Sequence, residues 1–130
     1  MAFEEIIHLT RQAKAAARAA AGLSSPQKNA VLLKAAQHLL ASQVRIIEEN
    51  RKDLRLAEQK GLSKAMIDRL TLDEKRIGDM AQGLREIVEL PDPVGQVVKG
   101  WTRPNGLRIE KVRIPLGVIG IIYESRPNVT

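Results

Sequence analysis

Hydrophobic residues in the first ninety positions recur at three- and four-residue spacing, which predicts amphipathic helices separated by stops. Residues 4–21 are rich in the strong helix formers Ala, Arg and Lys, and Gly22 follows them as a stop. Ser24, Ser25 and Pro26 supply a cap and a first-turn proline for the next helix. The apolar stripe of this second helix is formed by Val31, Leu32, Ala35, Ala36, Leu39 and Leu40.

Two further helical segments are predicted before residue 71. Ser42 caps or interrupts the chain ahead of a helix that Gly61 closes, and Ser63 is expected to cap a short helical turn after it. The buried face of the longer helix is predicted at Ile46, Ile47, Leu54 and Ala57, and that of the short turn at Met66, Ile67 and Leu70.

The clearest amphipathic helix begins near residue 74. Thr71 and Glu74 have the spacing of a capping box, in which the hydroxyl and the carboxylate each accept a hydrogen bond from a free backbone N–H. The apolar face that follows contains Ile77, Met80, Ala81, Leu84, Ile87 and Val88.

The pattern changes from helix to strand after the two prolines at positions 91 and 93, which forbid a continuing helix. Apolar and polar residues alternate over 107–109 and over 112–114, but the two segments are out of phase. A bulge or bend near residues 110–111 would reconcile them. Residues 103–106, which contain Pro, Asn and Gly, read as the turn that feeds this strand.

Residues 117–123 form a continuous apolar run instead of an alternating one. Such runs are typical of strands buried on both faces of a parallel sheet. A parallel sheet also needs neighbouring strands and covering helices. We therefore expect an α/β fold of which these 130 residues are the amino-terminal piece, with its first deeply buried strand just before the last residues.

Composition narrows the functional classes. The chain is 44% hydrophobic and 28% charged, an ordinary balance for a soluble globular protein. Its net charge of +6 is spread among acidic residues, and aromatic residues make up only 2%, so solvated helix faces are favoured over a nucleic-acid surface. A secretory signal and an apolar stretch of membrane-spanning length are both absent from the sequence, so a cytoplasmic location is expected.

Few residue types remain for a metal or thiol site. The chain contains no cysteine, which excludes a thiol nucleophile and a disulfide within these residues. His8 and His38 are too few for a zinc site without carboxylates, and Glu48, Glu49 and Asp53 read as a solvated helix surface. No metal site is therefore expected.

The candidate chemistry lies in the polar loop that follows the apolar run. Tyr123, Glu124, Arg126 and Asn128 come directly after the predicted strand. Ligands of open α/β sheets gather at the carboxyl ends of strands, so the loop is well placed for a site. From the residues alone, an ordinary strand-end turn is an equally good interpretation.

A family resemblance adds to this interpretation. The segment PLGVIGIIYESRPNVT at 115–130 closely resembles γ-glutamyl phosphate reductases, members of the aldehyde dehydrogenase superfamily. The likeness extends through GLSKAMIDRL at 61–70, LPDPVGQV at 90–97 and the Asn-x-x-Asp pattern at 50–53. It covers essentially the whole chain, and PLGVIG alone is shared across the wider superfamily.

The resemblance implies a three-part enzyme built from a cofactor domain, a catalytic domain and an oligomerising hairpin. Residues 1–90 would be the helical part of the cofactor domain, and 91–115 would form the hairpin, with strands around 94–98 and 107–114. Residues 116–130 would be the first strand and loop of the nucleotide-binding sheet.

The resemblance also implies a reaction. A cysteine thiolate displaces phosphate from γ-glutamyl phosphate, and NADPH then reduces the thioester to glutamate 5-semialdehyde on the route to proline. Because this chain has no cysteine, it would be inactive alone. A homo-oligomer is expected, with no nucleic-acid or membrane partner.

Roles for the loop residues follow from the same resemblance. Asn128 would donate its amide hydrogen to the developing oxyanion, although the superfamily pattern Pro-Trp-Asn is replaced here by Arg-Pro-Asn. Tyr123, Glu124 and Ser125 would lie along NADP, and Arg126 would pair with the phosphate or carboxylate of the substrate. A structural salt bridge from Arg126 and a loop-tying hydrogen bond from Asn128 remain as alternatives.

Two other functions stay open. One is a different aldehyde dehydrogenase that oxidises a free aldehyde. The other is a helical module that binds a partner or nucleic acid.

Overall fold

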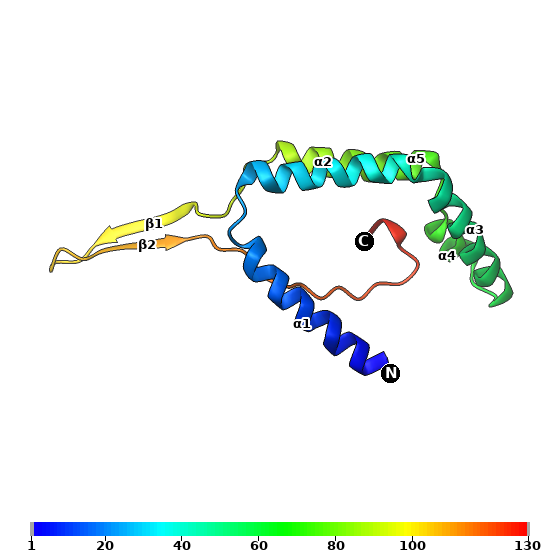
Figure 1. The fold of residues 1–130 in the computed structure, drawn as a ribbon, viewed down its shortest axis with the longest axis horizontal. Coiled ribbons are helices and arrows are strands. Elements are labelled where there is room, and N and C mark those ends of the chain that lie inside the picture. Colours follow the sequence, from blue (N-terminus) through cyan, green and yellow to red (C-terminus); the bar gives the residue numbers. More distant parts are fainter. Residues whose placement is uncertain (1, 130) are drawn as a thin grey trace. The chain divides into compact units, whose positions relative to one another are not determined.

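The computed structural model describes residues 2–129, in which five α-helices, a β-hairpin and one 3-10 helix form (Figure 1). This confirms the α/β class. The helices are α1 (Ala2–Ala20), α2 (Ser25–Ala41), α3 (Gln43–Gln59), α4 (Lys64–Leu70) and α5 (Glu74–Glu89). The strands are β1 (Val97–Thr102) and β2 (Arg108–Val112), and the 3-10 helix is η1 (Pro127–Val129).

The chain separates into two compact units. The first contains the residues up to Ser25 together with Pro91–Gly120, and so carries α1 and the hairpin. The second contains Pro26–Leu90 together with the residues from Ile121 onward, and so carries the helical core and η1. The loop with the candidate chemistry belongs to the second unit.

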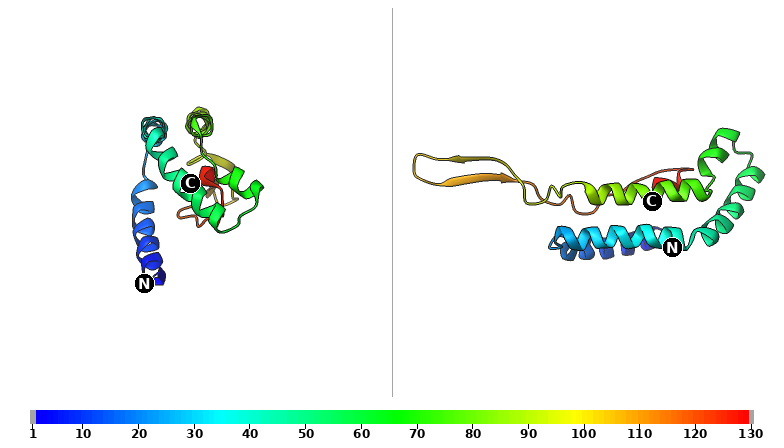
Figure 2. Two further views of the ribbon diagram at one scale, coloured as in Figure 1. Left: turned by 90° about the vertical axis from the view of Figure 1, so that its right-hand side faces the viewer. Right: turned by 90° about the horizontal axis from the view of Figure 1, so that it is seen from above.

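Within the second unit, α2 and α5 lie side by side and run in opposite directions (Figures 1 and 2). The side chains of Ile77 and Ala81 on α5 and of Ala36 on α2 have no exposed surface. An amide hydrogen of Asn29 on α2 reaches the carbonyl oxygen of Val88 on α5, with an N–O distance of 3.4 Å. Ile77, Ala81 and Ala36 belong to the buried part of the second unit.

The predicted apolar faces are confirmed unequally. Ala57 of α3 is buried, and the other residues of its predicted face are half-buried. On α2 the predicted stripe is partly wrong, because Val31 and Leu40 keep 61% and 36% of their surface exposed. The stripe is wider than the surface that its neighbours cover.

Two helix caps show how local the start signals are. Ser63 is the N-cap of α4, and its hydroxyl accepts from the amide of Met66 at 3.4 Å, as predicted. The predicted capping box at Thr71 is wrong. Asp73 is the N-cap of α5, and its carboxylate accepts from the amide of Arg76 at 2.7 Å, whereas the Thr71 hydroxyl donates to the carbonyl oxygen of Ile67 at 2.8 Å.

Replacing Asp73 with Ala is expected to destabilise the first turn of α5 by about 1 kcal/mol, because an N-cap carboxylate would be lost. Amide hydrogen exchange at Arg76 in the full-length protein should then be about fivefold faster. Glu74→Ala serves as the control and should change this exchange less. Equal effects of the two substitutions would contradict the assignment of the cap.

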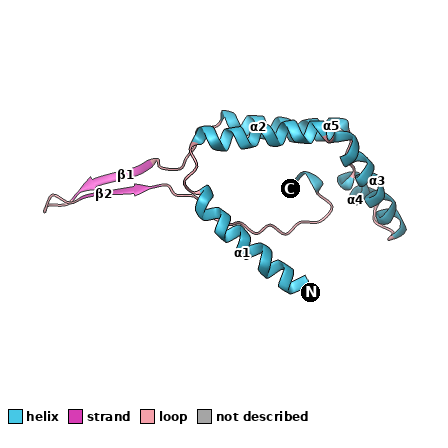
Figure 3. Cartoon of the chain, in the orientation of Figure 1, coloured by secondary structure: helices cyan, strands magenta, loops and turns pink. Residues whose placement is uncertain are grey.

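The hairpin in the first unit is an antiparallel pair (Figure 3). The predicted turn over 103–106 is confirmed, and Gly106 adopts a φ of 84° in it, a conformation that favours glycine. The first strand lies at 97–102 instead of 94–98. The bulge is also on the other strand: the register shifts between Val97 and Lys99, so the extra residue is Val98.

Residues 117–123 form no strand in the described part of the chain, and their predicted burial is wrong (Figure 3). Ile119 and Ile121 are each 62% exposed, and Ile122 is fully exposed. A strand is held by hydrogen bonds to a neighbouring strand, and among residues 2–129 only β1 and β2 are paired. An apolar run can predict a preference for burial but cannot provide the layer that buries it.

Among the described residues, none of the helices combines the length and the apolar character needed to span a membrane.

Candidate functional site

An open hollow of about 900 Å³ lies in the second unit and contains two of the predicted site residues. We call it the large hollow. Arg126 and Asn128 line it from the loop at η1, while α5 contributes an apolar face with Met80, Leu84 and Ile87. Further lining residues are Asp68 and Arg69 at the end of α4, Thr71 and Leu72 in the α4–α5 turn, and Arg76 and Asp79 of α5.

The loop backbone determines where Arg126 and Asn128 lie. Ser125 has a positive φ of 51°, which is uncommon for a residue with a side chain and turns the chain sharply before η1. The 3-10 turn is then closed by a hydrogen bond from the amide of Val129 to the carbonyl oxygen of Arg126, at 3.1 Å. The turn carries both side chains to the edge of α5.

Both side chains are exposed and available. Within residues 2–129, neither the Arg126 guanidinium nor the Asn128 amide forms a side-chain hydrogen bond or ion pair. The described structure therefore contains neither the salt bridge nor the loop-tying hydrogen bond that the sequence left open. Their donors are free to bind a ligand.

The structure does not bring the other three predicted residues into the large hollow. The lining of the large hollow does not include Tyr123, Glu124 or Ser125, which come just before Arg126 in the chain. Tyr123 keeps 46% of its surface exposed, Glu124 is exposed and Ser125 is half-buried. Only two of the five predicted site residues, Arg126 and Asn128, thus line the large hollow.

Charges around the large hollow favour an anion. The two carboxylates are already paired: Asp68 contacts Arg76 at 2.8 Å, and Asp79 contacts Lys75 at 2.7 Å. The hydrogen bond from Lys75 to Asp79 raises the pKa of Lys75 above its ordinary value. Arg69 and Arg126 have no such partner among the described residues, so the hollow carries uncompensated positive charge.

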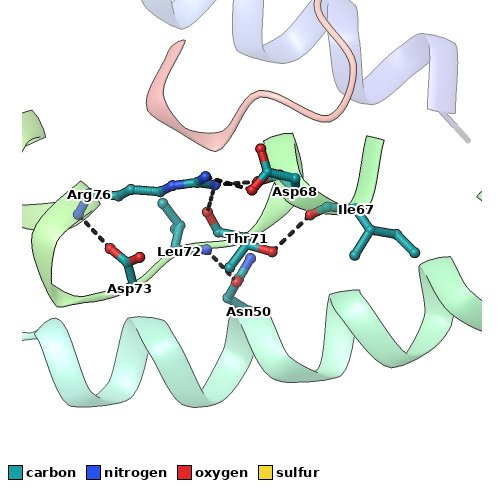
Figure 4. Close-up of polar contacts among 7 residues, drawn as sticks. All are labelled: Asn50, Ile67, Asp68, Thr71, Leu72, Asp73 and Arg76. Carbon is teal, nitrogen blue, oxygen red and sulfur yellow. Dashed lines mark hydrogen bonds and ion pairs between the residues drawn. The ribbon is translucent and has the colours of Figure 1, made fainter. Parts of the chain in front are cut away.

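Arg76 anchors the turn between α4 and α5 (Figure 4). Its guanidinium donates to the carbonyl oxygens of Asp68 and Thr71, the latter at 2.8 Å, and pairs with the Asp68 carboxylate. Three acceptors on one planar fork hold the end of α4 against the start of α5. This role could not be predicted from the sequence, because a single Arg within a charged helix has no distinctive spacing.

Asn50 holds the same turn from α3 (Figure 4). The side chain is only 5% exposed, its amide donates to the carbonyl oxygen of Leu70 at 2.9 Å, and its oxygen accepts from the amide of Leu72 at 2.8 Å. The signal was present in the Asn-x-x-Asp pattern at 50–53, but that pattern does not indicate which backbone groups the side chain reaches. No group of three or more residues suited to hold a metal ion occurs between residues 2 and 129.

Comparisons with known proteins identify the chain's relatives. No protein-family model matches it. The reductase of Carboxydothermus hydrogenoformans is 57% identical over 127 residues, which are 98% of this chain and 31% of that protein, and bears the name γ-glutamyl phosphate reductase. The protein of that name from Moorella thermoacetica is 58% identical over 120 residues, 92% of this chain and 29% of its own length.

The chain is similar to one part of γ-glutamyl phosphate reductase.

Solved structures of γ-glutamyl phosphate reductase agree. The Thermotoga maritima enzyme has a TM-score of 0.92 at 39% identity, with 96% of this chain and 30% of that chain covered. The Saccharomyces cerevisiae enzyme has a TM-score of 0.87 at 32% identity, with 94% and 31% covered. The predicted resemblance to γ-glutamyl phosphate reductase is confirmed, and the chain spans 29–31% of the length of these four relatives.

Proposed function

We propose that this chain is part of an enzyme that reduces γ-glutamyl phosphate to glutamate 5-semialdehyde and phosphate, with NADPH as the reductant, in proline biosynthesis. The observation that carries the proposal is the pair of unpartnered donors, Arg126 and Asn128, on one side of a positively charged hollow. The relatives named γ-glutamyl phosphate reductase support it. The substrate is an anion with both a phosphate and a carboxylate, which suits such a hollow.

Each donor has a chemical task in the proposed reaction. The guanidinium of Arg126 can bind two oxygens of a phosphate or carboxylate at once, which orients the substrate as well as holding it. The Asn128 amide can donate to the acyl oxygen as negative charge develops there during attack on the carbonyl carbon. The apolar face of α5 would exclude water from the same space.

Tyr123, Glu124 and Ser125 are proposed to contact the nicotinamide cofactor, which would supply the hydride when bound. Their groups fit a ribose and a flat ring: an exposed carboxylate can accept from sugar hydroxyls, and the Tyr123 ring offers a partly exposed surface. Their position outside the large hollow is compatible with separate places for cofactor and substrate.

A thiol nucleophile must come from outside these 130 residues, because the sequence contains no cysteine. We therefore propose that the chain alone is inactive and contributes one side of the site. The relatives are about three times as long, so they have room for the remaining parts.

Phosphate-dependent oxidation of glutamate 5-semialdehyde tests the proposal. The full-length protein, given this aldehyde and NADP, should form NADPH only when inorganic phosphate is present, since the reaction then runs in reverse. NADPH formation without phosphate would instead indicate an aldehyde dehydrogenase that releases the free acid. NAD in place of NADP tests the cofactor preference in the same assay.

Location and assembly are also proposed. An acyl phosphate and a dinucleotide are both highly charged and do not cross a bilayer unaided, which supports a cytoplasmic enzyme. The hairpin β1–β2 has two edges that no described strand covers, which supports assembly as a homo-oligomer through this element. A salt-sensitive gel shift with nucleic acid would favour the alternative of a helical binding module.

A further inference from the structure

We infer that Asn50 is a positioning residue for the loop that carries Arg126 and Asn128. The inference rests on the proposed function for its catalytic consequence, although its structural part can be tested without any substrate.

The first link joins α3 to the α4–α5 turn. Asn50 is 5% exposed, and its amide group bonds the carbonyl oxygen of Leu70 at 2.9 Å and the amide of Leu72 at 2.8 Å. One side chain thereby satisfies two backbone groups on either side of Thr71, as a neighbouring strand would. A buried amide with both ends bonded has little freedom, so the backbone of Leu72 is held in place.

The second link joins that turn to η1. A smaller hollow of about 360 Å³, which we call the small hollow, lies beside α3 and is lined by Asn50, Leu72 and Pro127. Leu72 and Pro127 also line the large hollow. Leu72 and Pro127 thus border both spaces, so a shift of Leu72 is expected to change the room available to Pro127.

The third link is covalent. Pro127 stands between Arg126 and Asn128 and opens η1, so a shift of Pro127 moves both proposed ligand-binding side chains. The ring of Pro127 fixes its own φ, which leaves the loop few ways to absorb such a shift. A displacement of about 1 Å at a catalytic group can cost a large factor in rate.

The test compares Asn50→Ala and Leu72→Ala in the full-length protein with Asn29→Ala as a matched control. Asn29 also donates to a carbonyl oxygen across two helices, that of Val88, but it lines neither hollow. Amide hydrogen exchange at Leu72 and Val129 is measured without substrate, and kcat and KM are measured with γ-glutamyl phosphate and NADPH.

Asn50→Ala should speed exchange at Leu72 and at Val129, whose amide closes η1, and lower kcat about tenfold with the KM for NADPH unchanged. Leu72→Ala should also speed exchange at Val129 and lower kcat about tenfold. The backbone amide of residue 72 should stay protected in this variant, because its hydrogen bond to Asn50 does not involve the leucine side chain. Asn29→Ala should change none of these quantities.

Faster exchange at Leu72 with unchanged exchange at Val129 and unchanged kcat would overturn the inference and leave Asn50 with a purely structural role. Equal losses of kcat for Asn50→Ala and Asn29→Ala would overturn it as well. A full-length protein without reductase activity would refute the proposed function instead, and exchange at Val129 would still decide whether Asn50 positions η1.

Discussion

Replacing Asn128 with Ala in the full-length protein is expected to lower kcat by about 10²–10³ while the protein stays folded, the usual cost of losing one donor to an oxyanion. The physical reason is that the amide would stabilise charge that exists only in the transition state. Its removal should therefore leave the KM for γ-glutamyl phosphate nearly unchanged. Folding should be preserved because Asn128 is exposed and its side chain bonds no other residue between 2 and 129.

The measurement is steady-state kinetics at saturating NADPH, with the melting temperature as a check on folding. Gln12→Ala is a suitable control, because Gln12 also carries an exposed amide without a side-chain hydrogen bond among the described residues, but lies in α1 of the first unit. A kcat of Asn128→Ala within a few-fold of the unsubstituted protein would remove Asn128 from the catalytic site. The loop would then have to be assigned to binding alone.

Replacing Arg126 with Ala is expected to raise the KM for γ-glutamyl phosphate by about 10- to 100-fold, the range that corresponds to one or two hydrogen bonds to a charged group. Because the guanidinium would hold the substrate in both the ground state and the transition state, kcat should fall less than kcat/KM. Arg126→Lys keeps the charge but loses the planar fork, so its KM should lie between that of the unsubstituted protein and that of Arg126→Ala.

Ionic strength provides an independent check on Arg126. The unsubstituted protein should show a KM that rises with salt, whereas Arg126→Ala should show a weaker dependence. Arg11→Ala is the matched control, since Arg11 is an exposed arginine of α1 in the other unit and, like Arg126, has no side-chain partner among the described residues. Equal KM values for Arg126→Ala and the unsubstituted protein would contradict a role in substrate binding.

Much of the local structure could be predicted from the sequence, and the reason lies in the range of the interactions. Five helices, the Ser63 cap and the turn at 103–106 depend on residues a few positions apart, so their signals are contained in short windows. The start of α5 shows the limit of this reasoning. Thr71 and Asp73 are both good caps, but Thr71 ends α4 as its C-cap and its hydroxyl donates to the carbonyl oxygen of Ile67, which leaves Asp73 to cap α5.

The candidate loop was also chosen from the sequence, since ligands of open α/β sheets gather where polar residues follow a buried strand. The sequence did not indicate which residues of this loop line the large hollow. That Arg126 and Asn128 line the large hollow while Tyr123 does not depends on the turn at Ser125 and on contact with α5.

The sequence by itself determined that five helices form, where the hairpin turns and which loop carries the candidate chemistry, because neighbours along the chain set these features. Only the tertiary structure decided what the side chains do there. Asn50 reaches Leu72 across 22 residues, and the bulge settled at Val98 because of the pairing between two strands. The apolar run at 117–123 stayed exposed because burial requires a partner surface, and none of the described residues supplies one as a paired strand.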